Sequence, residues 1–280
     1  IVAQFALYVV VLVQFTQYFV YFYWICVGVS LAVSLFISTR TFKMAYKIAW
    51  IIPILLVPLI GGVMYIILGG SRKPHYRRAE TRRAMKHYLV PQLSTTDFLH
   101  YGADAMQQAW YLEHAALCPA YRNTETTYYP TGADFFPVFL RELAQAKEYI
   151  FLEYFIIAEG SMWSDVLDIL TEKAAAGVEV RVFYDDMGSI GFVDTAFAKK
   201  LQQRGIQCRV FNPIVPVLNV FMNNRDHRKI TVIDGQVGYT GGYNLADEYF
   251  NLTHPYGRWK DSGVRLEGDA VRNLTLIFLE

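Results

Sequence analysis

The chain has 280 residues, 54% of them hydrophobic, and a formal net charge of +1. This length accommodates a membrane segment and one globular domain. The small net charge hides an asymmetry, because residues 1–90 carry ten Lys and Arg against one Glu, whereas residues 91–280 carry 16 bases and 24 acids. The acidic second part argues against a nucleic-acid-binding surface spread over the domain, so no nucleic-acid partner is expected.

The three cysteines, Cys26, Cys118 and Cys208, lie far apart in the sequence. Their spacing excludes a disulfide framework and a cysteine metal cluster, and it fits a reduced cytosolic face. The chain begins at Ile1 rather than at Met. We therefore expect that its N-terminus is missing.

The first 39 residues contain no charged side chain. One membrane span needs roughly 20 apolar residues, so this stretch is too long for a single helix. A polar dip at residues 14–17 predicts a turn between a truncated first span and a second span at residues 18–37. A third span is predicted at residues 48–68, because prolines and glycines are tolerated inside membrane helices. This recurrence excludes a cleaved signal peptide.

Seven bases follow the third predicted span and give the chain a direction across the membrane. They are Arg72, Lys73, Arg77, Arg78, Arg82, Arg83 and Lys86. By the positive-inside rule this end is cytoplasmic, although three bases in residues 38–47 compete with that assignment. We predict a multi-pass protein of the cell membrane with a cytoplasmic catalytic domain. The basic run is either a topology signal alone or also a contact for anionic lipids, at about 1 kcal/mol per base.

Three regions follow from these patterns. Residues 1–69 hold the transmembrane helices, the first of them truncated. Residues 70–130 form a basic juxtamembrane segment and a linker, with one short helix predicted near residues 103–116. Residues 131–280 form an α/β domain.

Helical and strand patterns alternate in the third region. Helices are predicted at residues 135–146, 163–176 and 193–204, and strands at residues 149–157, 178–184 and 206–211. This alternation predicts right-handed βαβ units and a mainly parallel, layered sheet. No glycine-rich loop follows the first strand, so the pattern does not support a dinucleotide-binding fold.

Two carboxylates, Asp185 and Asp186, end the second of these strands. Ligands often bind at this end of parallel strands, so the pair could hold a metal ion. The alternative, which we favour, is that the two side chains cap the turn that follows.

The stretch NNRDHRKITVIDG, residues 223–235, predicts a β-hairpin. Its first strand covers residues 228–233, its turn is Asp234–Gly235, and its second strand covers residues 236–240. Because alternate strand residues share a face, His227, Lys229 and Thr231 point together. Asp234 is an odd number of positions from His227, so it is better placed to fix the local structure than to touch the same ligand atom.

These side chains are suited to phosphate chemistry. A neutral imidazole is a good nucleophile toward phosphorus, and a lysine supplies a point charge for phosphate oxygens. His227 could therefore attack phosphorus and Lys229 could bind phosphate oxygens, with Asp261 as a candidate for the carboxylate that orients the imidazole. No metal or other cofactor is required, because the cations are side chains.

The hairpin leads into GGYN, residues 241–244, which offers further phosphate ligands. Gly241 and Gly242 let backbone N–H groups approach an anion, and Asn244 adds an amide donor. The spacing His-x-Lys-x4-Asp followed by Gly-Gly-x-Asn is far more specific than His-x-Lys alone. The alternative is a surface hairpin whose bases are merely solvated.

The motif HRKITVID…GGYN resembles that of the phospholipase D superfamily. With GRWKDSGVRLEG, YIFLEYFIIAEG, AGVEVRVFYDDMGS and the span AWIIPILLVPLIGGVMYIILGG, it is similar to the bacterial cardiolipin synthase family over nearly the whole chain. The resemblance implies an α/β phospholipase D-like half-domain, a layered mixed sheet flanked by helices. It also implies phosphatidyl transfer between two phosphatidylglycerol molecules through a phosphohistidine.

The resemblance assigns roles to the residues of the motif. It makes His227 the nucleophile or the acid/base partner, and makes Lys229 and Asn244 phosphate ligands. Asp234 completes the catalytic motif in a mainly structural role, and Asp261 orients His227. Glu153 either faces the site or is a structural acid at a strand end.

This chain departs from the family in one respect, because family members carry two such motifs that line one site. The other histidines, His75, His87, His100, His114 and His254, lack the accompanying Lys and Asp. We therefore expect a fragment that is inactive alone. It would need a second HKD motif, from a missing C-terminal half or from a second copy.

Other functions remain open from the sequence. The same chemistry serves a membrane-bound phospholipase D-like phosphodiesterase or another phosphatidyl transferase, because pocket shape selects the acceptor. A non-catalytic membrane scaffold is a third possibility. The acidic domain and the predicted spans argue against a nuclease.

Overall fold

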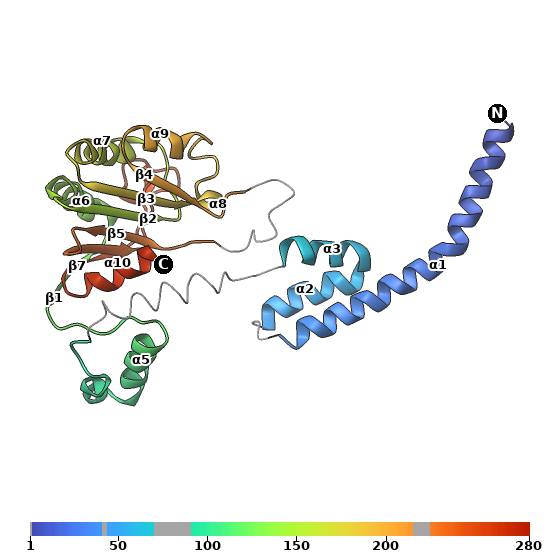
Figure 1. Ribbon diagram of the computed structural model, residues 1–280, viewed down its shortest axis with the longest axis horizontal. Helices are drawn as coiled ribbons and strands as arrows, with labels where there is room; N and C mark the ends of the chain where they lie inside the picture. Colours follow the sequence, from blue (N-terminus) through green and yellow to red (C-terminus); the bar gives the residue numbers. More distant parts are fainter. Residues whose placement is uncertain (1, 41–43, 70–90, 215–224) are drawn as a thin grey trace. The chain divides into compact units, whose positions relative to one another are not determined.

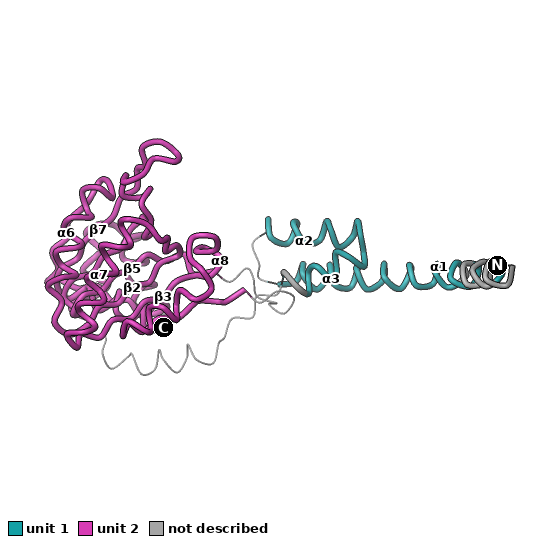
Figure 2. The backbone as a smooth tube through the Cα atoms, turned by 90° about the horizontal axis from the view of Figure 1, so that it is seen from above, with its two compact units in different colours: residues 1–72, 215–224 teal, residues 73–214, 225–280 magenta. Residues whose placement is uncertain are grey.

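The computed structural model describes residues 2–40, 44–69, 91–214 and 225–280 (Figure 1). These residues fall into two compact units that Figure 2 distinguishes by colour. Unit 1 contains the described residues up to Gly69, and unit 2 contains those from Pro91 onward. The predicted basic run at residues 72–86 lies outside the described residues.

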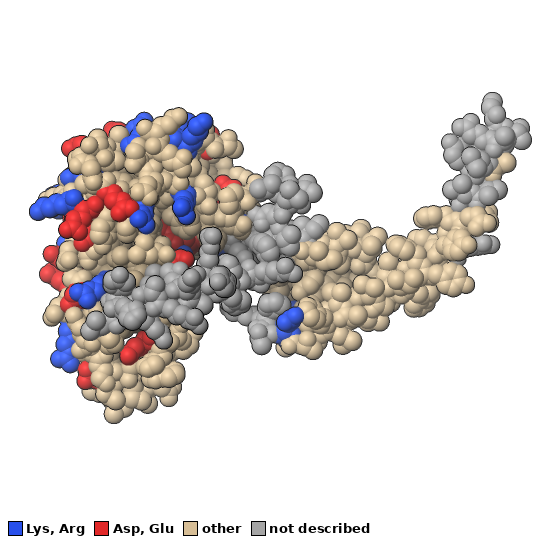
Figure 3. Space-filling model, viewed as in Figure 1, with Lys and Arg blue, Asp and Glu red and all other residues tan. Residues whose placement is uncertain are grey.

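Unit 1 begins with one long helix, α1 (Val2–Ser38). The turn predicted at residues 14–17 was wrong, because Gln and Thr fit into a helix and neither Pro nor Gly stands there to end it. Among the described helices, α1 alone is long and apolar enough to cross a membrane, over Val13–Ser38. Figure 3 shows that the visible face of unit 1 carries few charged side chains.

The predicted third span is divided into two short helices, α2 (Met44–Leu56) and α3 (Pro58–Leu68). Val57 has non-helical backbone angles of φ −132° and ψ 78°. The residue before a proline disfavours the helical conformation, so the first helix ends there and Pro58 starts the new one. A single helix over residues 48–68 was therefore a wrong prediction.

The two short helices form a hairpin against α1. A side chain at Gly61 would put a Cβ 2.4 Å from the Pro53 carbonyl oxygen, so glycine permits the close contact. Ser30 of α1 donates a hydrogen bond to the Pro58 carbonyl at 3.2 Å. At the open end, the Tyr46 hydroxyl donates to the Gly69 carbonyl at 2.7 Å.

Unit 2 is built on a seven-stranded sheet in the order β1-β7-β6-β5-β2-β3-β4. The strands are β1 (Thr124–Tyr129), β2 (Tyr149–Tyr154), β3 (Glu179–Asp185), β4 (Gln207–Phe211), β5 (Lys229–Ile233), β6 (Val237–Gly241) and β7 (Gly263–Gly268). Only the β2–β3 and β3–β4 pairs are parallel; the other four neighbouring pairs are antiparallel. The sheet is mixed, and the prediction of a mainly parallel sheet was wrong because the hairpin continues into β7.

Helices cover both faces of this sheet (Figure 1). The helices of unit 2 are η1 (Thr95–Tyr101), α5 (Ala103–His114), α6 (Gly132–Gln145), α7 (Ser161–Ala175), α8 (Asp186–Ser189), α9 (Phe197–Gln203), η2 (Asp247–Phe250) and α10 (Val271–Leu279). Of these, η1 and α5 pack on each other away from the sheet. Helices α6, α7 and α9 pack on one face and form the main core. Helix α10 packs on the other face, where Val271 and Leu274 contact Phe151, Ile230 and Val232.

Candidate active site

The sheet register brings the predicted site residues to one edge. Tyr154 at the end of β2 pairs with Lys229 at the start of β5, because these strands are antiparallel. Gly241 at the end of β6 pairs with Gly263 at the start of β7. The HRK segment (residues 227–229), the GGYN segment (residues 241–244) and the loop before β7 therefore lie at the same edge of the sheet.

Lys229 is the buried cation of this edge. Its side chain lies on the main-core face, is 6% exposed, and has its Nζ 5.3 Å from the centre of the Phe155 ring. Nζ donates a hydrogen bond to the His227 carbonyl oxygen at 2.8 Å. Burial lowers the pKa of the ammonium to about 8, against the opposite effect of the nearby Asp226 and Asp261 carboxylates. The group is therefore a desolvated cation that an anionic ligand would stabilise.

His227 is exposed and available to a ligand. Its ring centre lies 4.7 Å from that of Phe155, with the planes tilted by 53°. Within the described residues its side chain makes no hydrogen bond, and none joins it to Asp261. The imidazole is thus positioned by its backbone and by the Phe155 ring, and the orienting role of Asp261 remains a prediction.

Asp261 fits against the GGYN loop. A Cβ added at Gly242 would lie 1.7 Å from the Asp261 Oδ1 atom, so only glycine admits the carboxylate there. Oδ1 also accepts a hydrogen bond from the Ser262 N–H at 3.1 Å. Asp261 and Lys229 are close enough for the carboxylate to act on the lysine pKa.

Asn244 is buried and ties two segments together. Its Oδ1 accepts a hydrogen bond from the Ile156 N–H at 3.0 Å, and its Nδ2 donates to the Tyr249 hydroxyl at 2.9 Å. An amide nitrogen has two hydrogens, so one donor can still serve a phosphate. The Asn244 side chain therefore has a structural role in addition to the predicted role in binding phosphate.

Asp234 lies at the opposite end of the strand. Its carboxylate accepts hydrogen bonds from three successive N–H groups, those of Lys147 and Glu148 at 2.8 Å and Tyr149 at 2.9 Å. Seven residues of extended chain cover about 23 Å, so this carboxylate and His227 do not meet the same phosphate. The geometry places Asp234 in the scaffold rather than among the groups that react.

Asp185 and Asp186 hold neighbouring backbone rather than a metal ion. Asp185 accepts hydrogen bonds from the Gly188 N–H at 3.1 Å, the Asp226 N–H at 2.8 Å and the Arg225 guanidinium at 3.1 Å. Asp186 accepts one from the Ile214 N–H at 2.7 Å. The described residues contain no cluster suited to a metal ion. The capping interpretation is confirmed for Asp185, which caps the first turn of α8, whereas Asp186 accepts from a residue far along the chain instead.

A group that the sequence did not single out as a unit lies behind this edge. Glu153 pairs across the sheet with Ile230, so its side chain lies on the α10 face, away from Lys229. It contacts Arg228, which in turn pairs with Asp226. Asp226 and Arg228 are the immediate neighbours of His227. They alternate with His227 and Lys229 along the chain, and this alternation could have predicted a polar group on the opposite face.

Comparison with known proteins identifies the family. A family model described as cardiolipin synthase, PLD-like domain, matches residues 139–258. A second model, described as phospholipase D-nuclease N-terminal, matches residues 23–70. The chain belongs to the cardiolipin synthase family of phospholipase D-like proteins. This membership confirms the resemblance drawn from the HKD motif and the phospholipase D-like half-domain fold.

Relatives in this cardiolipin synthase family match most of the chain. Cardiolipin synthase 2 of Staphylococcus epidermidis is 32% identical over 259 residues, 88% of this chain and 52% of that protein. Cardiolipin synthase of Oceanobacillus iheyensis is 30% identical over 264 residues, 90% of this chain and 54% of that protein. An uncharacterized protein of Streptococcus mutans is 41% identical over 237 residues, which are 83% of this chain and 51% of that protein. The chain spans about half the length of the curated relatives it matches.

Proposed function

We propose that the protein is a membrane-bound phosphatidyl transferase that joins two phosphatidylglycerol molecules to give cardiolipin and glycerol. Membership of the cardiolipin synthase family supports this assignment. The observation that carries it is the exposed His227 beside the buried Lys229, at the edge where three strand ends meet.

The proposed reaction has two displacements at phosphorus. A ring nitrogen of His227 attacks the phosphodiester of the first phosphatidylglycerol, forming an N–P bond and breaking the bond to glycerol, which leaves with a proton. The hydroxyl of the second phosphatidylglycerol then attacks the phosphatidyl-histidine, loses its proton, and frees the imidazole. Lys229, the Gly241 N–H and the remaining Asn244 donor would stabilise the phosphate oxygens. The Gly242 N–H, which the sequence also suggested, already donates to the Ser262 carbonyl at 3.0 Å.

The proton that glycerol needs comes from a second histidine in this proposal. The curated relatives are about twice the length of the chain, which supports a second HKD motif in the complete protein. A second copy of the chain is the other source. In either case the exposed His227 would face the second histidine across the bound phosphodiester.

We also propose that α1 anchors the enzyme and that the catalytic unit is cytoplasmic. The apolar stretch Val13–Ser38 supports the anchor, and phosphatidylglycerol and other anionic lipids would be reached at the membrane surface. The predicted multi-pass arrangement needs residues 48–68 to cross as well. Helices α2 and α3, of 13 and 11 residues, favour a single crossing by α1 instead.

Product analysis tests the function. The complete protein is reconstituted in vesicles with phosphatidylglycerol as the sole lipid, and cardiolipin and glycerol are expected in equal amounts. His227→Ala should lower the rate by roughly 10³-fold or more, as loss of a nucleophile does. His254→Ala is the matched control, because His254 is also exposed and lacks the motif.

Two results would overturn the proposal. Phosphatidic acid without cardiolipin would identify water as the acceptor and make the protein a phospholipase. Unchanged product formation in His227→Ala would remove His227 from the chemistry, and a lipid profile that never depends on the protein would favour the scaffold.

A further inference from the structure

Three polar side chains lie directly behind the nucleophile, on the face of the sheet that α10 covers. They are Glu153 at the end of β2, and Asp226 and Arg228, the two residues that flank His227. Glu153 is 1% exposed and Asp226 is 6% exposed. Buried carboxylates in these positions require partners, because an unpaired charge away from water is strongly unfavourable.

Arg228 supplies those partners and joins the group to its surroundings. Its Nε donates to Asp226 Oδ1 at 2.9 Å, and its Nη2 lies 2.6 Å from Glu153 Oε1. The contact with Glu153 is an ion-pair distance without hydrogen-bond geometry, because within the described residues neither Glu153 oxygen has a hydrogen-bond partner. Its Nη1 donates to the Ile277 carbonyl of α10 at 3.0 Å. One guanidinium therefore holds both acids and the helix that covers them.

Two acids against one base leave a single proton to distribute between the acids. Burial, and then the neighbouring Asp226 carboxyl, raise the pKa of Glu153 to about 10. Burial acts to raise the pKa of Asp226 as well, but the adjacent Glu153 and the hydrogen bonds from Arg228 hold it below its usual range. Glu153 is therefore the acid of the pair that takes up a proton more readily.

The backbone on both sides of His227 is fixed by this group and by its neighbours. The Asp226 N–H donates to Asp185 at 2.8 Å, and the Arg228 N–H donates to the Asp226 carboxylate at 3.1 Å. The His227 carbonyl accepts from Lys229. Since the imidazole makes no hydrogen bond within the described residues, this backbone and the Phe155 ring set where it points.

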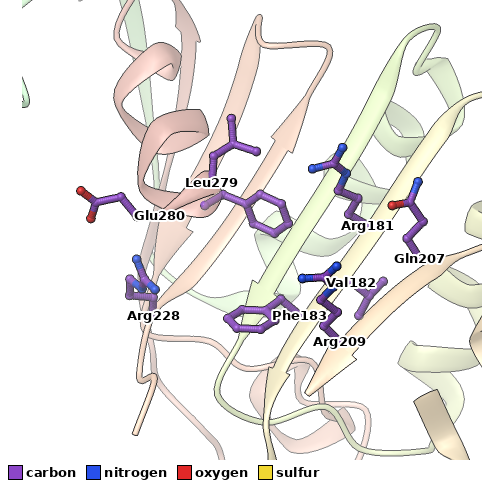
Figure 4. Close-up of a pocket in the computed structure, with 9 residues that line it drawn as sticks. Arg181, Val182, Phe183, Gln207, Arg209, Arg228, Leu279 and Glu280 are labelled. Carbon is purple, nitrogen blue, oxygen red and sulfur yellow. The ribbon is translucent and has the colours of Figure 1, made fainter. Parts of the chain in front are cut away.

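We propose that Glu153, acting with Asp226 and Arg228, is a positioning residue that holds the His227 imidazole in the orientation needed to attack phosphorus. The proposal rests on the proposed function, in which His227 is the nucleophile. Glu153 touches no substrate, since it lies on the opposite face of β2 from Lys229. Its effect passes through Arg228 and the backbone, and Figure 4 shows Arg228 lining the cavity of about 390 Å³ on this face.

The test compares two changes at Glu153 in the complete protein. Glu153→Gln keeps the shape and the neutral state, because the amide can accept from Arg228 and donate to Asp226; kcat should stay within about threefold of wild type. Glu153→Leu breaks both contacts and should lower kcat by roughly 100-fold with little change in KM, since an ångström of misplacement has that effect.

A second readout does not depend on turnover. The protein is labelled with ¹³Cε1-histidine in lipid nanodiscs, and the His227 signal is identified by its loss in His227→Gln. Glu153→Leu should shift or split that signal, and Glu153→Gln should leave it in place. If the wild type transfers no phosphatidyl group, the proposed function fails while this comparison still decides the positioning role.

Glu142→Leu is the matched control. Glu142 also pairs with an arginine, Arg265, and lies at the far end of the sheet from His227. Its loss should lower Tm while leaving kcat and the His227 signal unchanged. If Glu153→Leu does not fold, Arg228→Lys takes its place, because a single ammonium nitrogen cannot reproduce the planar fork whose three nitrogens reach Asp226, Glu153 and Ile277.

Three outcomes would overturn the positioning role. The first is a Glu153→Leu variant, or its Arg228→Lys substitute, with wild-type kcat. The second is an unmoved His227 signal in that variant. The third is a Glu153→Gln variant as impaired as Glu153→Leu, which would tie the effect to a carboxylate rather than to the held geometry.

Discussion

Lys229 combines two demands in one side chain. Its Nζ is buried beside Phe155 and fixes the His227 carbonyl, yet it must stay charged to attract a phosphate. Burial works against the charge and brings the pKa to about 8, within the range where enzymes are assayed. A phosphate bound beside Nζ would favour the protonated form and raise the pKa again.

This pKa predicts the alkaline limb of activity. Because the protonated lysine binds phosphate, kcat/KM should fall roughly tenfold per pH unit above about pH 8. kcat should fall at higher pH than kcat/KM, since bound substrate raises the pKa. Initial rates in phosphatidylglycerol vesicles across the range measure both.

Lys229→Arg separates charge from geometry. A guanidinium stays charged at all these pH values, so any residual activity should lose the alkaline limb. Lys199→Arg, on the exposed surface of α9, should leave the profile of the wild type. A kcat/KM that stays level well above pH 8 in the wild type would show that Lys229 does not set the limb.

For the residues of β5, the sequence predicted which side chains share a face, but it did not predict that both faces are buried. The pattern placed His227, Lys229 and Thr231 on one face and Ile230 on the other, and the structure agrees for the strand residues Lys229, Thr231 and Ile230. The pattern indicated only one buried face, whereas every residue of β5 is buried. A period of two residues shows which side chains share a face of the strand. Whether a face is buried depends on the helices that pack against it.

Among the elements, the contact between the GGYN loop and the loop before β7 is the closest at the site. Gly242 leaves room for the Asp261 carboxylate, which a Cβ would meet at 1.7 Å. This contact joins two segments of which only one carries the motif.

Gly242→Ala should therefore displace Asp261 and lower kcat/KM by roughly 100-fold. In the Asp261→Ala background, Gly242→Ala should lower kcat/KM far less, because the alanine methyl no longer meets a carboxylate. The coupling between the two changes should fall at about 1–3 kcal/mol, as for residues in contact.

Gly177→Ala is the control for the glycine prediction. Gly177 has a φ of +91° and nothing within 4 Å of an added Cβ, so its change strains the backbone without a clash. Stability should fall and kcat/KM of the folded protein should hold. Additive effects of Gly242→Ala and Asp261→Ala would contradict the link between the two loops.

Elements with a clear hydrophobic period were predictable, and elements at the margins were not. Strands β2 to β6 and helices α6 and α7 lie where their periodicity placed them. Strand β1, with the sequence TETTYY, contains no buried residue and fell within the predicted linker. Strand β7 and helix α10 were missed as well, because each is stabilised by a partner distant in the sequence. Strand β7 pairs with β1, and α10 packs against Phe151.

For the whole molecule, the hairpin of α2 and α3 bears on membrane topology. At 1.5 Å per residue, α2 and α3 are about 20 Å and 16 Å long, against a hydrocarbon core of about 30 Å. The contact of Ser30 with Pro58 sets the hairpin tip beside a point about 12 Å from the end of α1. In the proposed single crossing by α1, a hairpin of this length would enter the membrane and return on the same side.

We expect the loop after α1 and the catalytic unit to share the cytoplasmic side. With Cys118 replaced by serine, Thr39→Cys and Lys199→Cys should both resist a membrane-impermeant maleimide in intact cells. Both should react after permeabilisation. This arrangement also places the bases of residues 38–47 with those of residues 72–86, so the positive-inside rule no longer gives competing answers.

A crossing hairpin gives the opposite pattern. Thr39→Cys would then react in intact cells while Lys199→Cys stayed protected. That result would restore the multi-pass arrangement predicted from the apolar composition of residues 48–68.

The pairing of β1 with β7 also fixes an order of assembly. Strands β2, β3 and β4 are joined by short crossovers and can pair soon after each emerges during synthesis. Strand β1 emerges before all of them, yet Thr124 pairs with Gly268, close to the C-terminal end of unit 2. Contacts between such distant segments form late, since the intervening chain must first be ordered. We therefore expect the first strand to leave the ribosome to be the last to join the sheet, and its polar sequence would keep it soluble until then.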